Sequence, residues 1–312
     1  MRDVTIAIPT YNRASLTHRA VIAAMSQTYE NLHVIVIDDG STDNTLEVLS
    51  EFFDQPNFLY VKLGRNVGTA NAKNVALMLC QTKAISFHDP DDIPLQDKII
   101  CQARTLFGTY AIASSVLNWQ RTSLRADQKF YPDVVLSGHD IVLPSGKVVR
   151  VSNDLSLVDD FFPQLSIGSE TPGDWVHINS GLFRLEVFEK IGGFDDCIEE
   201  DRDLRNRIIM AGLPVRVIKP ALLVKYECED SLTQASETNY ASERRQKDRE
   251  KIWQRISSWS QGVKVDPIQI ALDDITISFM SKPWSGNISD VPMVSQTQTN
   301  LNSQLAQWQK RV

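Results

Sequence analysis

Three aspartates stand within four positions of the sequence, at Asp89, Asp91 and Asp92, directly after the apolar stretch 84–87. Packed carboxylates repel one another, so such a cluster after a buried strand is typical of a site that holds a cation. Oxygen ligands without nitrogen or sulfur favour a hard ion such as Mg²⁺ or Mn²⁺. Because Mg²⁺ is normally held by one or two carboxylates together with substrate phosphates, the cluster predicts a metal that binds a diphosphate. The alternative interpretation is a capped turn with no ligand.

A second acidic group lies at Glu199, Glu200, Asp201 and Asp203, at the start of a helix predicted over 199–211. The dipole of a helix stabilises carboxylates in its first turn, so this group has an ordinary structural explanation. A carboxylate can also act as a general base when it lies within hydrogen-bond reach of the proton that it removes. The residues by themselves leave both interpretations open.

Further polar residues follow other apolar runs near the N-terminus, in segments 9–12, 38–43 and 64–68. A carboxylate just past a strand, such as Asp39, can accept the N–H of a nucleotide base or a ribose hydroxyl. Tyr11 can stack on the same base through its aromatic face. The alternative is that 38–43 forms a turn and caps the next helix, with Ser41 or Thr42 as the cap.

The elements that position these segments follow from the hydrophobic pattern. Continuous apolar runs predict strands, and the stretches between them predict helices. The predicted strands are 4–8, 33–37, 58–62 and 84–87, and the predicted helices are 15–26, 43–52 and 69–79. This order is typical of an α/β protein whose mostly parallel sheet carries helices on both faces. In such sheets ligands bind beyond the carboxyl ends of the strands, where the polar segments and the aspartate cluster lie.

The second half of the chain is less regular. It predicts a helix over 96–107, strands over 110–117, 215–218 and 222–226, and a hairpin turn at 144–146. A long polar helix is predicted over 237–259, followed by a weaker apolar segment over 268–279 and a polar tail. We therefore expect a mainly helical C-terminal extension after the sheet.

The composition is that of a globular protein, with 42% hydrophobic and 23% charged residues. A net charge of −7 argues against a nucleic-acid partner, because phosphate backbones are bound by clustered lysine and arginine. The four cysteines are widely spaced without a C-x-x-C pair, which predicts reduced thiols and a cytoplasmic protein. The pattern indicates neither a signal peptide nor a membrane span. Peripheral contact with the inner face of the membrane and formation of oligomers are left open.

Four segments, taken in their order and spacing, resemble glycosyltransferase family 2, a large group of inverting enzymes with the nucleotide-sugar-binding GT-A fold. They are 8–12, 36–43, 64–68 with 72–74, and 89–92. Residues 192–195, followed by Glu200, Asp201 and Arg207, look like the acceptor half of that family. The resemblance covers residues 3–230, and it implies a GT-A fold, a nucleotide-sugar donor and bound Mn²⁺ or Mg²⁺.

The resemblance assigns nucleotide contacts to the N-terminal half of the chain. It places Asp39 on the base, while Pro9, Thr10, Tyr11 and Asn12 lie at the same strand ends. By the family's D-x-D motif, Asp91 is the best metal ligand, and Asp89 contacts either the ribose or the metal through water. Asp92 then orients its neighbours or caps the following helix.

Arg65, Gly68 and Lys73 are candidates for contacts with phosphate or base. A glycine before a helix, here Gly68, lets backbone amides approach an anion at the helix N-terminus. The alternative is that Arg65 is a loop residue in solvent and that Lys73 lies on an exposed helix face.

The family's Glu-Asp motif implies that Asp201 is the general base that takes the proton from the acceptor hydroxyl, with Glu200 as the alternative. Trp175, His177 and Asn179 border the predicted acceptor site, because sugars pack on indole faces and polar groups bind their hydroxyls. Core packing of Trp175 and a structural role for His177 remain the alternatives.

Two features depart from the family pattern. Many members carry a histidine near segment 226–229, before a serine that Ser231 resembles, and its absence here leaves an additional metal or phosphate contact in doubt. The Gln-x-x-Arg-Trp motif of processive synthases is also missing, which favours transfer of a single sugar.

The sequence therefore predicts a metal-dependent inverting glycosyltransferase. It would move one sugar from a nucleotide-diphosphate sugar, with UDP expected, to a hydroxyl of a saccharide or glycolipid, as in synthesis of cell-surface polysaccharide or glycoconjugates. The predicted domains are 1–230, with a nucleotide-binding half 1–117 and an acceptor-binding half 118–230, and an extension 231–312. The alternative is a non-catalytic sugar-nucleotide-binding protein that acts as a scaffold. A nucleotidyltransferase is disfavoured, because 9–12 is not a glycine-rich, basic phosphate loop.

Overall fold

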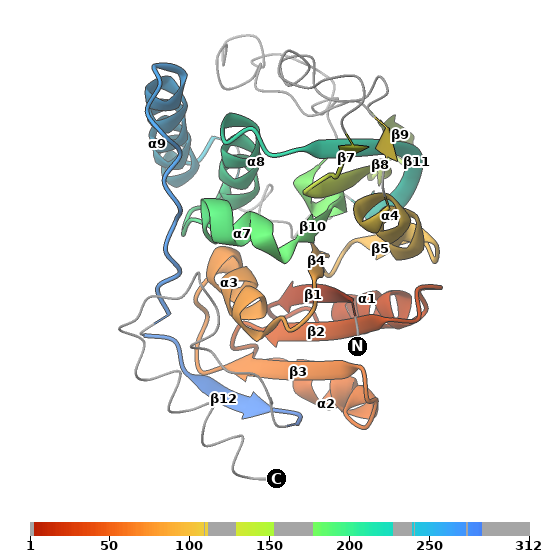
Figure 1. Ribbon diagram of the computed structural model, residues 1–312. Coiled ribbons are helices and arrows are strands. Elements are labelled where there is room, and N and C mark those ends of the chain that lie inside the picture. The colour runs from red at the N-terminus through yellow and green to blue at the C-terminus, as the bar shows by residue number, and fades with distance from the viewer. Residues whose placement is uncertain are drawn as a thin grey trace.

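The computed structural model describes residues 3–108, 110–111, 129–152, 177–226, 239, 241–272 and 274–282. Within these ranges a large mixed sheet is flanked by helices (Figure 1). The elements of the first half are β1 (Val4–Thr10), α1 (Ala14–Met25), β2 (Leu32–Asp38), α2 (Thr45–Leu49), η1 (Ser50–Phe52), β3 (Phe58–Leu63), α3 (Thr69–Leu79), β4 (Ala84–Phe87), β5 (Ile93–Pro94), α4 (Lys98–Phe107) and β6 (Tyr110–Ala111). Those of the second half are β7 (Lys129–Phe130), β8 (Val134–Val142), β9 (Val148–Val151), η3 (Ile178–Ser180), β10 (Leu182–Arg184), α7 (Leu185–Ile191), α8 (Glu200–Met210), β11 (Val215–Tyr226), α9 (Glu243–Ser260) and β12 (Ile277–Met280).

The four strands predicted in the N-terminal part form the parallel half of the sheet. β3, β2, β1 and β4 are neighbours in that order, and each neighbouring pair is parallel. Their residues are buried along almost their whole length, because helices cover both faces. Parallel strands bring their carboxyl ends to one edge, so the segments after β1, β2 and β4 meet there.

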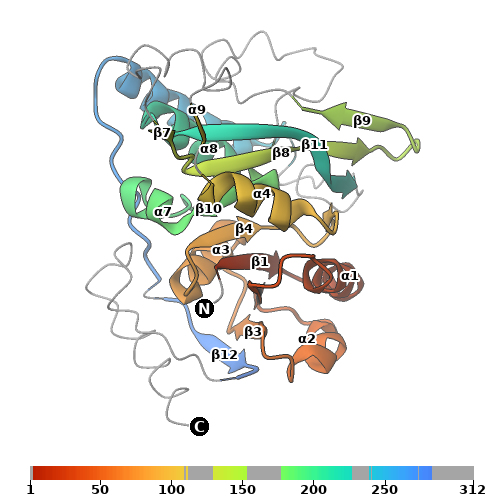
Figure 2. The same cartoon turned by 45° about the vertical axis from the view of Figure 1, so that its right-hand side comes forward.

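The other half of the sheet is mixed. β10 pairs antiparallel with β4 and β8, β11 runs parallel to β8, and β5 closes this side antiparallel to β11. β9 pairs antiparallel with β8, and Figure 2 shows it extending from that side of the sheet. This pairing, with Val142 opposite Val148, confirms the predicted hairpin around 144–146. The two strands predicted at 215–218 and 222–226 are one irregular strand, β11.

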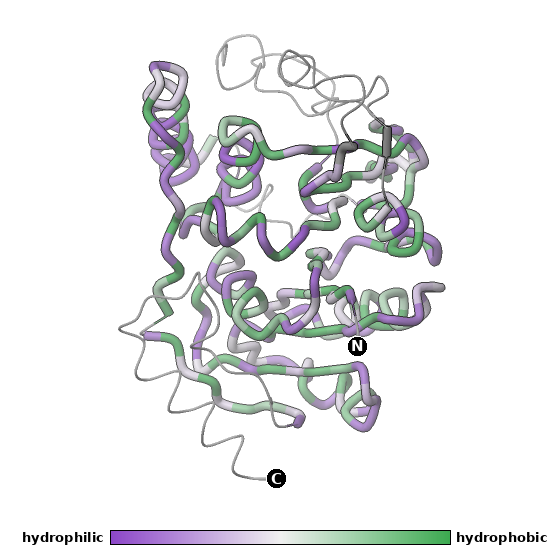
Figure 3. The backbone as a smooth tube through the Cα atoms, in the orientation of Figure 1, coloured by the Kyte–Doolittle hydropathy of each residue, from purple (hydrophilic) through white to green (hydrophobic). Residues whose placement is uncertain are grey.

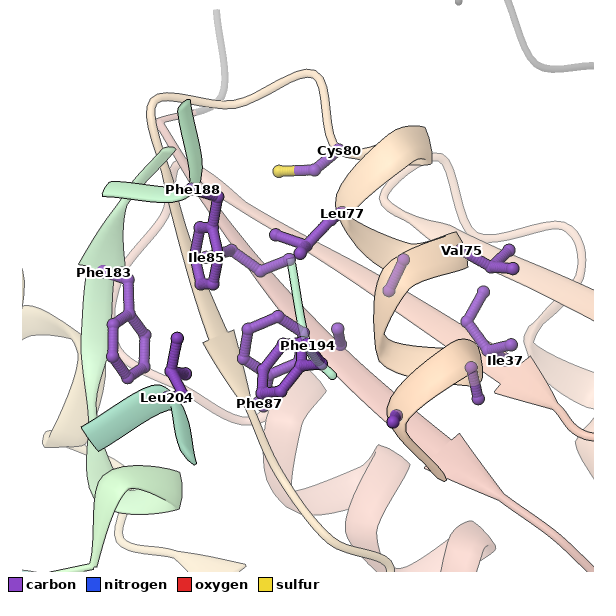
Figure 4. Packing of buried hydrophobic residues seen from close by; sticks show 14 of the residues in the cluster. Ile37, Val75, Leu77, Cys80, Ile85, Phe87, Phe183, Phe188, Phe194 and Leu204 are labelled. Carbon is purple, nitrogen blue, oxygen red and sulfur yellow. The ribbon is translucent and has the colours of Figure 1, made fainter. Parts of the chain in front are cut away.

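Two apolar cores lie on opposite faces of the sheet. Ala7 and Ile37 belong to the cluster that contains the buried side of α3, whereas Ile6 and Ile8 pack with residues of α1 and α4. The alternation along β1 shows that successive side chains enter different cores. Apolar residues follow the strands in Figure 3. Figure 4 shows the first cluster where it links the two halves, with the rings of Phe87 and Phe194 5.0 Å apart and edge-on.

The predicted cap of the second helix is wrong. The helix predicted over 43–52 is an α-helix only as α2, and Asn44 occupies its N-cap position without a side-chain hydrogen bond. Neither Ser41 nor Thr42 caps it, because the Ser41 hydroxyl accepts the Asn12 N–H at 2.8 Å instead. Of the strand predicted over 110–117, the structure describes residues 110–111, as β6.

The chain after α9 returns to the sheet. Residues 264–272 and 274–276 run down one side of the molecule in Figure 1 and lead to β12, which pairs antiparallel with β3. On the way, Ile268 forms a β-bridge with Gly192, and the Gly64 N–H donates to the Thr276 carbonyl at 2.8 Å. The expectation of a mainly helical extension is therefore only partly right. A strand that covers the edge of β3 satisfies its outer backbone groups, which would otherwise be open to pairing with other chains. The predicted domain boundaries stay predictions.

Candidate functional site

The loops that follow β1 and β2 are bonded to one another. The Asp39 N–H donates to the Thr10 carbonyl at 2.8 Å. Asn12 has a φ of 51°, and its Oδ1 accepts the N–H of Thr42 at 2.7 Å. A left-handed backbone is uncommon outside glycine but is tolerated by asparagine. The Asn12 side chain therefore joins the loop after β1 to the loop after β2. This structural role does not depend on contact with a ligand.

The side chains of segment 9–12 differ in their exposure to solvent. Pro9 is buried within β1, and the Thr10 hydroxyl lies 2.6 Å from that of Thr17 inside the protein. Tyr11 is 43% exposed. The Tyr11 ring is thus open to stacking, whereas Pro9 and Thr10 contribute backbone and packing.

Asp38 is completely buried and has partners within the protein for both oxygens. Its Oδ1 accepts the Ser41 N–H at 2.7 Å, and its Oδ2 accepts the hydroxyl of Tyr60 in a short hydrogen bond. Burial and the bond to Asp38 raise the pKa of Tyr60. Asp38 therefore shapes the turn after β2, which leaves the next aspartate as the candidate for binding.

Asp39 joins the β2 loop to the start of α3. Its two oxygens accept the N–H groups of Val67 at 2.7 Å and Gly68 at 2.9 Å. Burial raises the pKa of Asp39 to about 6, although these two N–H groups favour the ionised form. The amide of Gly68, predicted to approach a phosphate, thus donates to a carboxylate of the same chain. That carboxylate occupies the position at the N-terminus of α3 where an anion is stabilised.

Arg65 lies beside this carboxylate on an exposed loop. Its positive charge lowers the pKa of Asp39, against the larger effect of burial. The loop approaches Gly40 so closely that a Cβ there would lie 2.6 Å from the Arg65 carbonyl carbon. Gly40 also has a φ of 76°, so only glycine suits this position without strain.

The aspartates after β4 are clustered as predicted. Ligand oxygens of Asp89, Asp91 and Asp92 all lie within 4.8 Å of one another. The three differ in their partners: Asp91 pairs with Arg13 at 3.1 Å, and both oxygens of Asp92 accept from Lys225 at 2.8 and 3.0 Å.

The electrostatic surroundings also differ among the aspartates. Burial raises the pKa of Asp92 to about 7, even though Lys225 opposes this effect. Burial acts in the same direction on Asp89, but Lys73 and Lys225 hold the pKa of Asp89 below its ordinary value. Asp89 also accepts the Asn179 side-chain amide at 2.9 Å. The two lysines thus favour the ionised form of Asp89.

The residues present fit a hard divalent cation. Carboxylate oxygens are the ligands that Mg²⁺ and Mn²⁺ prefer, and three of them lie within reach of one ion here. Lys225 already holds both oxygens of Asp92. Asp91 and Asp89 are accordingly the ligands that the arrangement favours, and this remains a prediction.

Lys73 is neither exposed nor on a solvent-facing side of α3. It is 1% exposed, and its Nζ donates to Glu200 Oε1 at 2.9 Å. Burial lowers the pKa of Lys73, but the carboxylates of Glu200 and Asp89 outweigh this effect and raise it above its ordinary value. Burial raises the pKa of Glu200 to about 7 despite this lysine. The two residues form a buried pair between α3 and α8.

Asp201 stands next to Glu200 in the first turn of α8. It is half-buried, and its Oδ1 accepts the N–H of Arg202 at 2.7 Å. Its charge, together with those of Asp89 and Glu200, contributes to raising the pKa of Lys73. The two acidic groups seen in the sequence therefore converge on one lysine.

Two of the three predicted acceptor residues are described by the structure. The rings of His177 and His139 are 4.4 Å apart, and burial, with Lys225 nearby, lowers the pKa of His177 well below its ordinary value. Asn179 contacts Asp89, as described above, so it belongs to the surroundings of the aspartates. Trp175 lies outside the described residues.

Three residues of this site were missed by reasoning from sequence. Arg13, adjacent to the predicted segment 9–12, could have been found as the nearest cation in that loop. Lys225 and His139 lie on β11 and β8, and nothing in their local sequence indicates that they would approach β4. Their roles depend on the order of strands in the second half of the sheet.

Comparison with known proteins agrees with this fold. Residues 5–114 match the family model for glycosyl transferase family 2. The structure of S. aureus TarS residues 1–349 in complex with UDP-GlcNAc superposes with a TM-score of 0.61 at 16% identity, covering 85% of this chain and 68% of TarS. The protein has the GT-A fold.

Related sequences place the chain more closely. It is 35% identical over 99 residues to the E. coli UDP-Glc:alpha-D-GlcNAc-diphosphoundecaprenol beta-1,3-glucosyltransferase WfaP, which covers 32% of this chain and 39% of WfaP. It is 34% identical over 210 residues to an uncharacterized glycosyltransferase of Rickettsia prowazekii, which covers 64% of this chain and 56% of that protein. The chain thus spans less than two thirds of these curated relatives. Its residues 5–114 are thus similar to glycosyltransferase family 2. Among the helices that the structure describes, none has the length and apolar character needed to cross a membrane.

Proposed function

We propose that this chain is a metal-dependent, inverting glycosyltransferase that transfers one sugar from a UDP-sugar to a hydroxyl of a saccharide or glycolipid. The observation that carries the proposal is that the buried Lys73 donates to Glu200, beside Asp201, at 2.9 Å, while Asp89 contributes to the electrostatic surroundings of the same lysine. Asp89 of the aspartate cluster and the Glu200–Asp201 pair all act on the pKa of Lys73. A transferase requires this juxtaposition, because the leaving diphosphate and the acceptor proton must be handled at adjacent places.

The nucleotide would lie across the ends of β1 and β2. Tyr11 exposes its ring for stacking, and Asp39 is fixed by two backbone N–H groups at the edge of the base position. Because each carboxylate oxygen can accept more than one hydrogen bond, Asp39 can also accept an N–H from uracil. Arg65 adds positive charge beside it.

Asp91 and Asp89 would hold the divalent cation against the diphosphate. When bound, the cation neutralises the charge that develops on the leaving nucleoside diphosphate. Arg13 and Lys225 already form ion pairs with Asp91 and Asp92, respectively, and so place positive charge on the same side of the site.

Asp201 would remove the proton of the acceptor hydroxyl. The freed oxygen then bonds to the anomeric carbon as the bond from that carbon to the diphosphate oxygen breaks on the opposite face. The configuration at the anomeric carbon is thereby inverted. Glu200 is the weaker candidate for the base, because the Lys73 ammonium group already contacts it at 2.9 Å. A base must reach the proton of the substrate.

The expected substrates follow from the relatives. WfaP is named for a UDP-glucose donor and a diphosphoundecaprenol-linked acceptor, and TarS was solved with UDP-GlcNAc. These names support a UDP-sugar donor and an acceptor used in polysaccharide or glycoconjugate synthesis. Because such an acceptor is anchored in the membrane, we propose that the protein acts peripherally at the inner face of the membrane.

A thermal-shift screen of nucleotide sugars with and without Mn²⁺ tests the proposal. A ligand that binds the native state raises apparent stability. We expect UDP-sugars to shift the melting temperature more than GDP-sugars, and only when Mn²⁺ is present. A donor-hydrolysis assay on the best ligand then separates an enzyme from a non-catalytic binding protein. Binding without release of UDP, with and without saccharide acceptors, would favour the scaffold.

A further inference from the structure

Glu199 immediately precedes the Glu200–Asp201 pair and is held by three arginines. It is 3% exposed. Its carboxylate accepts from Arg245 at 2.8 Å and from Arg249 at 2.9 and 3.1 Å, both on α9, and from Arg202 on α8. Its carbonyl accepts the N–H of Asp203 at 2.9 Å, which is the first turn of α8. Glu199 is therefore joined to α9 by its side chain and to α8 by its backbone.

Other side chains of α9 form hydrogen bonds and ion pairs with the same segment on both sides of Glu199. Asp248 accepts the Ile198 N–H at 2.8 Å. Arg255 bridges Asp195 and Asp203, with 2.8 Å to each. Side chains of α9 thus contact positions 195, 198, 199 and 203, which bracket Glu200 and Asp201.

α9 packs against the start of α8 through charged as well as apolar side chains. The buried side chains Ile252 and Ile256 already give α9 an apolar face. Buried ion pairs are often no more stabilising than apolar residues of similar size, because desolvation of the charges offsets their attraction. Charged groups of fixed geometry do determine the register in which two elements meet. The network thus joins α9 to the start of α8 at several fixed points.

We propose that Glu199, Arg245 and Arg249 are positioning residues that fix the start of α8, and through it the carboxylate of Asp201. This inference rests on the proposed role of Asp201 as the base. It assigns a task in the reaction to the C-terminal helix, which carries no residue of the family motifs. Displacing a reacting group by about 1 Å can cost about a hundredfold in rate.

The test compares Arg245→Ala/Arg249→Ala with Arg249→Lys and with Lys190→Ala. Lys190→Ala removes an exposed ion pair on α7 and serves as the matched control. For the double variant we expect kcat for transfer to fall about 10- to 100-fold, while KM for the donor and affinity for UDP with Mn²⁺ change less than twofold. Arg249→Lys should keep most of the activity. Retained UDP affinity shows that the variant is folded.

Hydrogen exchange provides a readout that does not depend on activity. In the double variant, amides 200–204 should exchange at least tenfold faster, while those of α3 stay unchanged. Unchanged exchange at 200–204, or a kcat within twofold of wild type, overturns the positioning role. A wild-type protein that transfers no sugar from any donor refutes the proposed function instead, and the exchange measurement then still decides whether α9 orders the start of α8.

Discussion

The aspartates after β4 show how neighbours divide the tasks of similar side chains. Asp92 contacts Lys225 through both oxygens, whereas Asp91 contacts Arg13 through Oδ2. Asp92 is almost fully buried, while the Asp91 side chain is 15% exposed. A ligand to an ion shared with a diphosphate needs an accessible oxygen. This favours Asp91 over Asp92 as the main metal ligand.

Asp91→Asn should weaken the effect of Mn²⁺ on UDP binding. The amide keeps the shape of the side chain but loses the negative charge that attracts the cation. We expect Mn²⁺ to improve UDP affinity at least tenfold less in the variant than in wild type, measured by calorimetry. The exposed Asp54→Asn is the control and should behave as wild type. An unchanged dependence on Mn²⁺ in Asp91→Asn would remove this residue from the metal site.

Asp201→Asn should separate binding from chemistry. The amide cannot take up the acceptor proton, so we expect transfer to fall by about 10²–10⁴. Affinity for UDP with Mn²⁺ should stay within twofold. Single-turnover measurements with a matched acceptor check the rate. Full activity would contradict the assignment of the base, and a comparable loss in Glu200→Gln alone would transfer the role to Glu200.

Between elements, the most consequential contact is that of α3 with α8. Lys73 is the buried cation that joins them, and it contacts Glu200 and the Phe194 ring, whose centroid lies 5.3 Å from Nζ. The helices belong to the two halves of the fold, so this contact joins the half proposed to bind the nucleotide to the half proposed to hold the base. The Phe87–Phe194 cluster in Figure 4 supplies the apolar part of the same junction.

Lys73→Met should destabilise the protein, because it leaves the buried Glu200 without its cation. Removing one member of a buried pair costs on the order of 3 kcal/mol. Urea denaturation at neutral pH measures this loss, and Lys83→Met, at an exposed lysine, is the control. Adding Glu200→Gln to Lys73→Met should recover part of the stability. If the double variant is less stable than Lys73→Met alone, the ion pair is not the cause.

For the molecule as a whole, the C-terminal segment connects distant parts of the sheet. α9 contacts α8 through the Glu199 network, and β12 closes the edge at β3 (Figure 1). Residues after the family match thus stabilise both the acidic start of α8 and the outermost parallel strand. Global stability should therefore respond to the charge state of this network.

Acid should remove the contribution of Glu199 to stability. The three arginines hold the pKa of Glu199 near 2, against burial, which raises it; its ordinary value is 4.5. Because the folded-state pKa is the lower one, the contribution is complete above pH 4.5 and is lost as the pH falls toward 2. Two to three pKa units correspond to on the order of 3 kcal/mol. The stability difference between wild type and Glu199→Gln, from denaturant unfolding, should shrink between pH 6 and pH 3. A difference that does not vary with pH would contradict this origin.

The fold of the first hundred residues could be predicted almost completely. The ends of the strands predicted at 4–8, 33–37, 58–62 and 84–87 agree with the structure within a few residues. The reason is that buried parallel strands consist of continuous apolar runs in the sequence. Strand β12 was missed, because a single edge strand of four residues has no distinctive pattern. The bulged β11 was predicted as two strands for a similar reason: Pro220 interrupts its pattern.

The sequence predicted which residues make up the candidate site, but only some of the contacts between them. The aspartate cluster and the Glu-Asp pair are local in sequence, so their spacing was sufficient to indicate them. The partner of Lys73 was not predictable, because Glu200 lies on a helix from the other half of the chain. The same holds for Lys225, which reaches the aspartates from β11.

By itself, the sequence determined the parallel sheet, the strand ends that carry the polar segments and the similarity of residues 5–114 to glycosyltransferase family 2. These depend on periodicity and on residues close together in the chain. Only the tertiary structure decided which cation pairs with each carboxylate, and that α9 contacts the segment that carries the proposed base. The physical reason is that ion pairing and burial depend on distances between elements, and strand order in a mixed sheet sets those distances without leaving a local pattern.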